Sequence, residues 1–289
     1  MSKELLAKYK GPVFILLAAL CWSTTGTSQA LAPEGATPYV IGGLRLWLGC
    51  FFLFLLCFFT KKLPDLKTLP KKSAFLSAMG ILFFQLFFFA SVSKTGVAVG
   101  TAAVCGLSPI MAGLFAFIFL KERPSGLWYF ATLIAIVGLV LLSLTDDMQA
   151  NAMGLLLALA AASAYAVYVV FAKQLSGGEP AAMIMVLFAI GSVFVTPVFF
   201  MFPIDWIFTP RGLLVSLHLG LIATALGYTC YLTGLQTTPV STAATLNLSE
   251  SIEAACWGVF ILGEMLLPLH LAGMGLIFAS TLVLTVKPK

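Results

Sequence analysis

Apolar runs of about 20 residues follow one another along the whole sequence, and a helix of that length spans the hydrocarbon core of a bilayer. They are too long and too uniformly apolar for the strands of a membrane β-barrel, which alternate over about 10 residues. A soluble domain is excluded as well, because 61% of the 289 residues are hydrophobic and only 9% are charged. Ordinary domains carry about 25% charged residues. The sequence therefore predicts an all-α membrane protein with many spans.

Proline, glycine and charged residues separate the apolar runs, as helix breakers do. They predict ten membrane-spanning helices, near residues 11–32, 38–60, 73–93, 97–120, 125–145, 152–174, 180–203, 212–235, 239–262 and 267–286. With the N-terminus inside, 13 of the 16 Lys and Arg residues lie on the inner side, and only Lys94 and Arg211 lie on the outer side. By the positive-inside rule both termini are cytoplasmic, in a multi-pass protein of the plasma membrane.

The two halves of the chain resemble each other at an offset of 142 or 143 residues. The matching segments are 11–23 with 154–166, 97–102 with 239–244, and 120–122 with 262–264. Generic similarity between apolar helices is the alternative, but it does not explain why Gly, aromatic and Leu-x-Glu residues recur in register. We predict two repeats, residues 1–147 and 148–289, each with five spans. Because five is odd, the second repeat is inverted, as in many secondary transporters that bind substrate near the midplane between repeats.

Several short motifs resemble those of EamA-type members of the drug/metabolite transporter superfamily, over essentially the full length. They are Ala19-Leu20-Cys21-Trp22-Ser23, Leu44-Arg45-Leu46, Leu107-Ser108-Pro109, Leu120-Lys121-Glu122, Gly138, Leu248-Ser249-Glu250 and Leu262-Gly263-Glu264. The resemblance implies ten helices in two inverted five-helix repeats around a central cavity, and export of small metabolites. Ser251 stands where this family often has proline, which implies a less kinked helix at this position.

The span near 239–262 carries two acidic residues near mid-membrane, where an acid costs roughly 2.5 to 3.5 kcal/mol to insert. On a helix, Glu250, Glu253 and Trp257 share one face, and Asn247 lies beside it. Ionisable groups inside membranes usually have a function, and desolvation and like charge favour the protonated form of one of two neighbouring carboxylates. We therefore predict proton coupling at Glu250 first and Glu253 second. The alternative is a structural ion pair with Arg45, or an inert wet cavity.

Arg45 is the one basic residue deep in a predicted span. It could bind a substrate carboxylate, neutralise a glutamate, or act in structure or gating. Together with the two glutamates it gives a net charge that suits a cation, a zwitterion or a proton exchanged for substrate. Aromatic side chains could hold a cation by contacts worth about 0.5 to 2 kcal/mol, or only pack. The predicted substrate site comprises Trp22, Arg45, Gln85, Tyr165, Tyr228, Tyr231, Asn247, Glu250, Glu253 and Trp257.

These residues predict a proton-coupled secondary transporter that exports amino acids, amphipathic amines or drug-like compounds by alternating access. An uncoupled facilitator or exchanger, an importer and, more distantly, an intramembrane enzyme are the alternatives. No phosphate-binding Gly-rich loop is present, so an ATPase is not predicted. No nucleophile accompanies the glutamates, and the six cysteines lie inside apolar runs without zinc-like spacing. We therefore predict no enzyme activity, metal or cofactor, a small-molecule and lipid environment without nucleic acid, and a monomer or homodimer.

Overall fold

The structure, a computed structural model, describes residues 3–64, 67, 69–95, 97–142, 151–175, 177–263 and 267–286. All regular secondary structure in these ranges is helical. In chain order the elements are α1 Lys3–Ala30, α2 Pro38–Thr60, α3 Lys71–Thr95, α4 Val97–Phe115, η1 Ala116–Leu120, α5 Gly126–Leu142, α6 Ala152–Lys173, α7 Pro180–Val195, α8 Val198–Met201, η2 Asp205–Phe208, α9 Pro210–His218, η3 Leu219–Leu226, α10 Gly227–Leu235, α11 Val240–Leu246, α12 Ser249–Trp257, η4 Gly258–Leu262 and α13 Pro268–Val286.

Eight helical stretches of the described chain are long and apolar enough to cross a membrane. They are Tyr9–Ala30, Pro38–Thr60, Lys71–Phe88, Gly100–Leu120, Ala152–Lys173, Pro180–Met201, Pro210–Leu235 and Pro268–Thr285. A further apolar helix at Gly126–Leu141 is shorter. The expected span near 239–262 is divided among α11, α12 and η4. The prediction of an all-α membrane protein is confirmed, and the number of ten spans stays a prediction.

Local chemistry explains where the helices begin. Proline occupies the first turn of α2, α7 and α9, where the missing backbone N–H is not needed. The side chain of Thr37 accepts a hydrogen bond from the Val40 N–H at the start of α2, and Asn151 Oδ1 accepts one from the Gly154 N–H at the start of α6. These caps satisfy backbone donors that have no partner within the helix.

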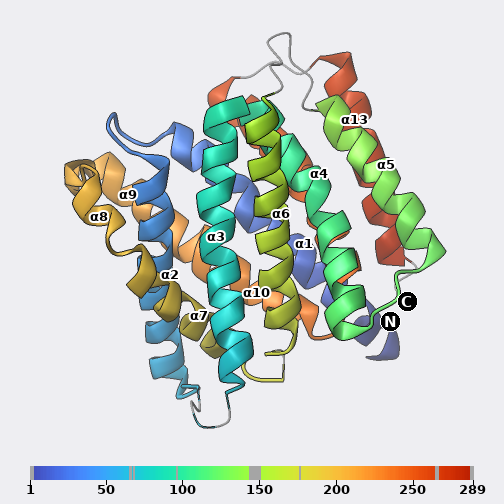
Figure 1. Cartoon of the computed structure of the whole chain (residues 1–289), viewed down its shortest axis with the longest axis horizontal. Coiled ribbons are helices and arrows are strands. Elements are labelled where there is room, and N and C mark those ends of the chain that lie inside the picture. Colours follow the sequence, from blue (N-terminus) through green and yellow to red (C-terminus); the bar gives the residue numbers. More distant parts are fainter. Residues whose placement is uncertain are drawn as a thin grey trace.

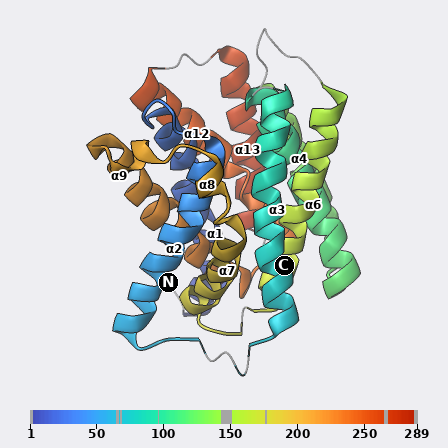
Figure 2. The same cartoon turned by 60° about the vertical axis from the view of Figure 1, so that its left-hand side comes forward.

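The helices form a bundle in which α3 lies along α6, and α5 lies along α13 (Figures 1 and 2). Other extensive pairs are α4 with α6, α1 with α10, and α2 with α7. Large apolar side chains cover the outside of the bundle, and Phe59, Phe200 and Phe260 are 75%, 86% and 81% exposed. Such an apolar exterior suits lipid rather than water.

Two close approaches between helices match at the repeat offset. A Cβ atom added to Gly11 on α1 would clash with Thr238, just beyond the end of α10. A Cβ atom added to Gly154 on α6 would clash with Thr95, at the end of α3. Gly154 lies 143 positions after Gly11, and Thr95 lies 143 positions before Thr238. The α1–α10 and α6–α3 contacts are therefore built from equivalent positions of the two halves.

The wide π-helical turns η1 and η4 also correspond, because their bounds differ by 142 residues. Each ends in a residue with left-handed backbone, Lys121 at φ 55° and Gly263 at φ 72°. Glycine adopts this conformation without strain, whereas lysine has a Cβ atom that disfavours it. The turn η3 differs from both, because the equivalent residues 77–84 belong to the regular helix α3.

Candidate functional site

The acidic span changes its winding where the glutamates begin. The N–H groups of Leu248, Glu250 and Ser251 donate to the carbonyls three residues earlier, at 3.0 to 3.1 Å. Such bonds tighten the chain into a 3₁₀-like turn between α11 and α12. The continuous helix expected over 239–262 is therefore wrong, and the absence of proline at Ser251 does not keep the helix regular. Interrupted helices are common at transporter binding sites.

Asn247 and Glu250 meet across this turn. Asn247 Nδ2 donates to Glu250 Oε2 at 3.2 Å, and Glu250 lies in the first turn of α12. The N-terminal end of a helix favours a negative charge. Glu250 is also half-buried rather than enclosed. Its carboxylate is thus held by one side-chain donor and lies at a helix end, and part of the residue remains accessible.

Several polar atoms of this turn are buried without a hydrogen-bond partner in the described structure. They include Asn247 Oδ1, Ser249 Oγ and Glu253 Oε2. Ser249 lies one turn before Glu253 and faces it closely enough to interact, but the pair does not meet the geometry of a hydrogen bond. Buried polar groups are rarely left unpaired, because each costs about 1 to 3 kcal/mol. These atoms can pair with a polar ligand.

Arg45 approaches this region from α2. Its Nε donates to Thr224 Oγ1 at 3.2 Å, inside the wide turn η3. The charge of Arg45 acts on Glu250, yet the one ion pair within 4.0 Å among the described residues joins Lys62 to Glu179. The alternative of a direct ion pair between Arg45 and the glutamates is therefore wrong for this conformation. The guanidinium can still form hydrogen bonds to an anionic group.

Five aromatic residues from three helices form a cluster, namely Trp22 of α1, Tyr165 and Tyr168 of α6, and Tyr228 and Tyr231 of α10. The Trp22 ring lies 4.8 Å from that of Tyr228 and 5.1 Å from that of Tyr231. The hydroxyls of Tyr165 and Tyr231 are 2.8 Å apart. Trp22 Nε1 and the Tyr168 hydroxyl are buried and have no hydrogen-bond partner among the described residues. Tyr231 contacts both repeat-related residues, because its ring packs on Trp22 and its hydroxyl pairs with Tyr165.

The acidic helix and the aromatic cluster adjoin each other. Trp257 Nε1 donates to Ser23 Oγ at 3.0 Å, which ties α12 to α1 beside Trp22. The charge of Glu250 also acts on Tyr165 and Tyr228. Nine of the ten predicted site residues are therefore gathered in one region, contributed by α1, α2, α6, α10 and the α11–α12 segment.

Gln85 is the exception. It is half-buried on α3 and lines a small hollow of about 20 Å³ with residues of α2, α7 and α8. The structure gives it no contact with the glutamates or the aromatic cluster. Its polarity within an apolar run suggested a site role, but polarity alone does not determine which face of α3 is turned inward.

Four residues complete the region without having been predicted as site residues: Ser23, Tyr168, Thr224 and Ser249. Tyr168 lies one turn after Tyr165, so its helical spacing could have signalled it. Ser23 and Ser249 are sequence neighbours of Trp22 and Glu250. No feature of the sequence connects Thr224 with Arg45, since 179 residues separate them.

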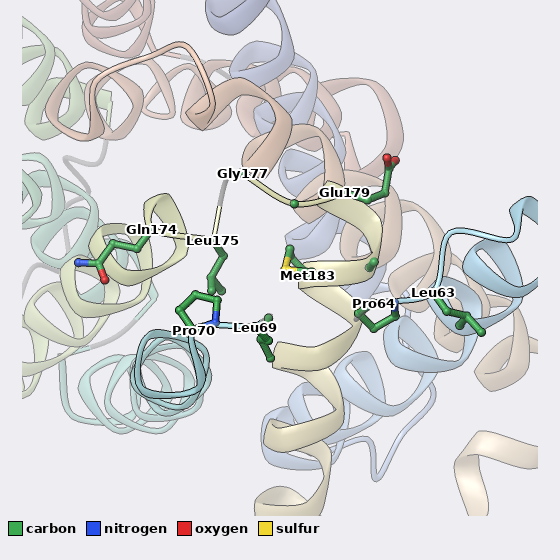
Figure 3. A pocket seen from close by; sticks show the side chains of 11 residues that line it. Leu63, Pro64, Leu69, Pro70, Gln174, Leu175, Gly177, Glu179 and Met183 are labelled. Atoms are coloured by element: carbon green, nitrogen blue, oxygen red, sulfur yellow. The ribbon is translucent and has the colours of Figure 1, made fainter. Parts of the chain in front are cut away.

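A larger hollow of about 400 Å³ lies away from this region, beneath the α2–α3 and α6–α7 connections (Figure 3). Apolar side chains including Leu69, Pro70, Leu175 and Met183 line it, with Gln174 and Glu179 as its polar side chains. It contains none of the predicted site residues. We therefore place the candidate site at the buried polar and aromatic cluster rather than in this hollow.

Comparison with known proteins agrees with these features. Residues 9–144 and 152–286 each match the EamA-like transporter family. The chain is 39% identical over 279 residues to "Uncharacterized transporter YwfM" of Bacillus subtilis (strain 168), covering 96% of this chain and 94% of the relative. It is 30% identical over 295 residues to "Threonine/homoserine exporter RhtA" of Escherichia coli (strain K12), covering 96% and 92%.

A crystal structure with 16% sequence identity shares the fold, at a TM-score of 0.83 over 96% of both chains. The family match covers nearly the whole chain, and the named relatives are transporters. The resemblance seen in the sequence motifs is thereby confirmed. This chain belongs to the EamA-like transporter family and is a membrane transporter.

Proposed function

We propose that this protein is a secondary active transporter of the plasma membrane that exports a small amino acid or amphipathic amine by proton-coupled alternating access. The observation that carries the proposal is the interrupted helix at Asn247–Glu250. It presents a half-buried carboxylate and unpaired polar atoms beside an arginine and an aromatic cluster. A core that served only for packing would pair or remove these groups.

The architecture of the proposal is ten spans in two inverted five-helix repeats, residues 1–147 and 148–289. Three observations support it: the matching wide turns η1 and η4, the equivalent contacts at Gly11 and Gly154, and the family match to each half. The helix pairs add to this, because exchanging the two halves converts α1–α10 into α6–α3. Such repeats allow one half to rock against the other around a central site.

The orientation of the proposal has both termini in the cytoplasm. The α2–α3 and α6–α7 connections, the start of α1 and the end of α13 lie toward the same end of the bundle (Figure 1). This end, which we call the basic end, carries most of the lysines and arginines, including Lys61, Lys62, Lys121 and Lys173. The excess of positive charge supports a cytoplasmic position for it.

The chemistry of the site suits a zwitterion. The carboxylates of Glu250 and Glu253 and the Asn247 oxygen accept hydrogen bonds from an ammonium group, whereas Arg45 and Trp22 Nε1 donate to a carboxylate. The aromatic rings supply walls for the apolar part of the substrate. A relative is named a threonine/homoserine exporter, which makes hydroxylated amino acids the first compounds to test.

Proton coupling follows when a substrate ammonium and a proton compete for the same carboxylate. In this scheme Glu250 releases the substrate on the outer side, takes up a proton there and returns neutral. Moving the neutral acid through the low-dielectric interior avoids the cost of an unpaired buried charge. Glu253 is the second candidate for this role.

The test is substrate counterflow and pH-jump uptake in proteoliposomes, with threonine, homoserine, other amino acids and aromatic amines. We compare wild type with Glu250→Gln and with the control Glu179→Gln, which removes an exposed carboxylate from the Lys62 pair. We expect a pH gradient to drive substrate in wild type and in the control. Glu250→Gln should retain exchange and lose the response to the gradient.

Other results would correct specific parts of this proposal. Gradient-driven transport that survives in Glu250→Gln but is lost in Glu253→Gln would move the proton carrier to Glu253. If wild type shows saturable counterflow that does not respond to the pH gradient, the protein is an uncoupled exchanger or facilitator. A complete lack of counterflow with every compound would reject the substrate class.

A further inference from the structure

In the described conformation, α6, α10 and α11 meet toward the basic end of the bundle. Here α6 contacts α10 and α11, and the Tyr165–Tyr231 hydroxyl pair joins α6 to α10. Beyond that pair, Val169, Val170 and Ala172 of α6 and Leu235 of α10 are buried, with exposures of 2% or less. These residues pack α6 against α10 between the aromatic cluster and the basic end, and none of them lines the hollow of about 400 Å³ at that end.

Two charged residues close this end by binding the chain between α10 and α11. The ammonium group of Lys173, the last residue of α6, donates to the carbonyl oxygens of Leu235 and, at 2.7 Å, Thr238. On the other side, Glu122 Oε2 accepts from the backbone N–H of Val240 at 2.9 Å. Hydrogen bonds of charged groups are shorter and stronger than those of neutral ones. We call this set of three bonds the clamp.

The clamp acts on the helices that build the proposed site. Leu235 ends α10, which carries Tyr228 and Tyr231, and Val240 begins α11, which leads directly to Asn247 and Glu250. A cation at the last carbonyls of α10 also complements the dipole of that helix. The two charges lie close enough to act on one another. The clamp thereby couples closure of the basic end to the position of the acidic helix.

The opposite half of the bundle is looser. Every residue of α12 from Ser251 to Trp257 is half-buried, whereas α11 is almost entirely buried. The residue equivalent to Lys173 at the repeat offset of 143 is Ala30, which has no charge to form a second clamp.

We infer that Lys173 and Glu122 form an inner gate that holds the transporter closed at the basic end and accessible from the opposite face. They are positioning residues, because they act through α10 and α11 and do not contact the proposed site. The inference rests on the proposed alternating-access mechanism. When the clamp opens, the α10–α11 connection is free to separate from α6, and access changes sides.

Cysteine labelling measures this without any substrate. Cys256 is half-buried on α12, away from the clamp, and a variant that keeps only this cysteine tests whether access to α12 depends on the clamp. Right-side-out membrane vesicles are treated with a membrane-impermeant maleimide. Loss of the clamp by Lys173→Met should slow labelling of Cys256 about tenfold, as the population shifts to the other state.

Matched variants separate gating from general damage. Lys173→Arg keeps a cation that can donate to the same carbonyls and should restore the wild-type labelling rate. Lys62→Met removes an exposed ion pair at the same end and should leave labelling unchanged. Glu122→Ala removes the Val240 partner and should slow labelling in the same direction. If Lys173→Met does not yield monodisperse protein, the labelling rate of Glu122→Ala tests the gate instead.

A labelling rate within twofold of wild type in folded Lys173→Met or Glu122→Ala would overturn the inference. The same slowing in Lys62→Met would overturn it too, since that result would reflect the surface charge of the basic end. Counterflow measured on the same vesicles distinguishes the two proposals. If counterflow is intact but the labelling rate does not change in the clamp variants, the gate alone is rejected. If the labelling rate depends on the clamp but counterflow is absent, the proposed substrates alone are rejected.

Discussion

Gly80 offers a quantitative test of how closely α3 and α6 pack. A Cβ atom at this position would lie 2.5 Å from Tyr168 N, 2.9 Å from Tyr168 Cα and 2.9 Å from Ala164 O. All three are backbone atoms of α6, which cannot turn aside as a flexible side chain can. Ordinary contact begins at 3.4 Å, so Gly80→Ala requires the two helices to separate by about 0.9 Å.

The magnitude follows from two opposing effects. Overpacking of this kind costs about 1 to 3 kcal/mol, and a gap near 1 Å forfeits about a quarter to a half of the dispersion energy of the facing atoms. Alanine recovers up to about 1 kcal/mol through its helix propensity. The Ser77 Oγ–Tyr168 O hydrogen bond, at 3.0 Å, crosses the same interface. We expect a net loss of about 2 kcal/mol.

That loss should lower the apparent melting temperature in detergent by roughly 4 to 8 °C, measured by size-exclusion chromatography after heating. Gly275→Ala is the matched control, because a Cβ atom on this α13 glycine meets nothing within 4 Å. It should leave the melting temperature unchanged or raise it. If Gly80→Ala melts at or above wild type while the control behaves as expected, α3 and α6 do not approach as closely as described.

Two further substitutions test the polar contacts of the interior. Tyr231→Phe leaves the buried Tyr165 hydroxyl without its 2.8 Å partner and should cost about 1 to 3 kcal/mol, whereas the double phenylalanine variant should be less destabilised than the two single effects summed. Additive effects in thermal unfolding would contradict the bond. Trp128→Phe removes donation from the indole to Ser241 O at 2.9 Å and Thr245 Oγ1 at 3.1 Å, and the resulting loss of about 1 to 2 kcal/mol should appear as a lower melting temperature. An unchanged melting temperature would show that the indole bonds do not hold α11 against α5.

The positions of the helices follow largely from local chemistry, and this much is readable from the sequence. The run predicted at 38–60 is the helix Pro38–Thr60, and that predicted at 152–174 is Ala152–Lys173. Pro38 and Asn151 provide the reason, because each acts on the backbone within one turn of the helix start. Such signals need no information about the rest of the fold.

The contacts that make the site depend on distant segments, and the sequence does not contain them locally. Arg45 meets Thr224 rather than a glutamate, and Gln85 lines a small hollow with residues of α2, α7 and α8. The helix interruption at Asn247 also escaped prediction, because no proline or glycine marks it. There the Asn247 side chain donates to the Glu250 side chain across the turn, a contact that residue spacing alone does not distinguish from one on a regular helix.

The wide turns described above bear on the history of the chain. A π-turn inserts one extra residue into a helix, and η1 and η4 carry that insertion at equivalent positions with the same left-handed ending. Duplication and fusion of one ancestral segment would account for both. The turn η3 has no counterpart among the equivalent residues 77–84, which belong to α3. It carries Thr224, the partner of Arg45, so the two descendants diverged beside the cluster while their scaffold stayed alike.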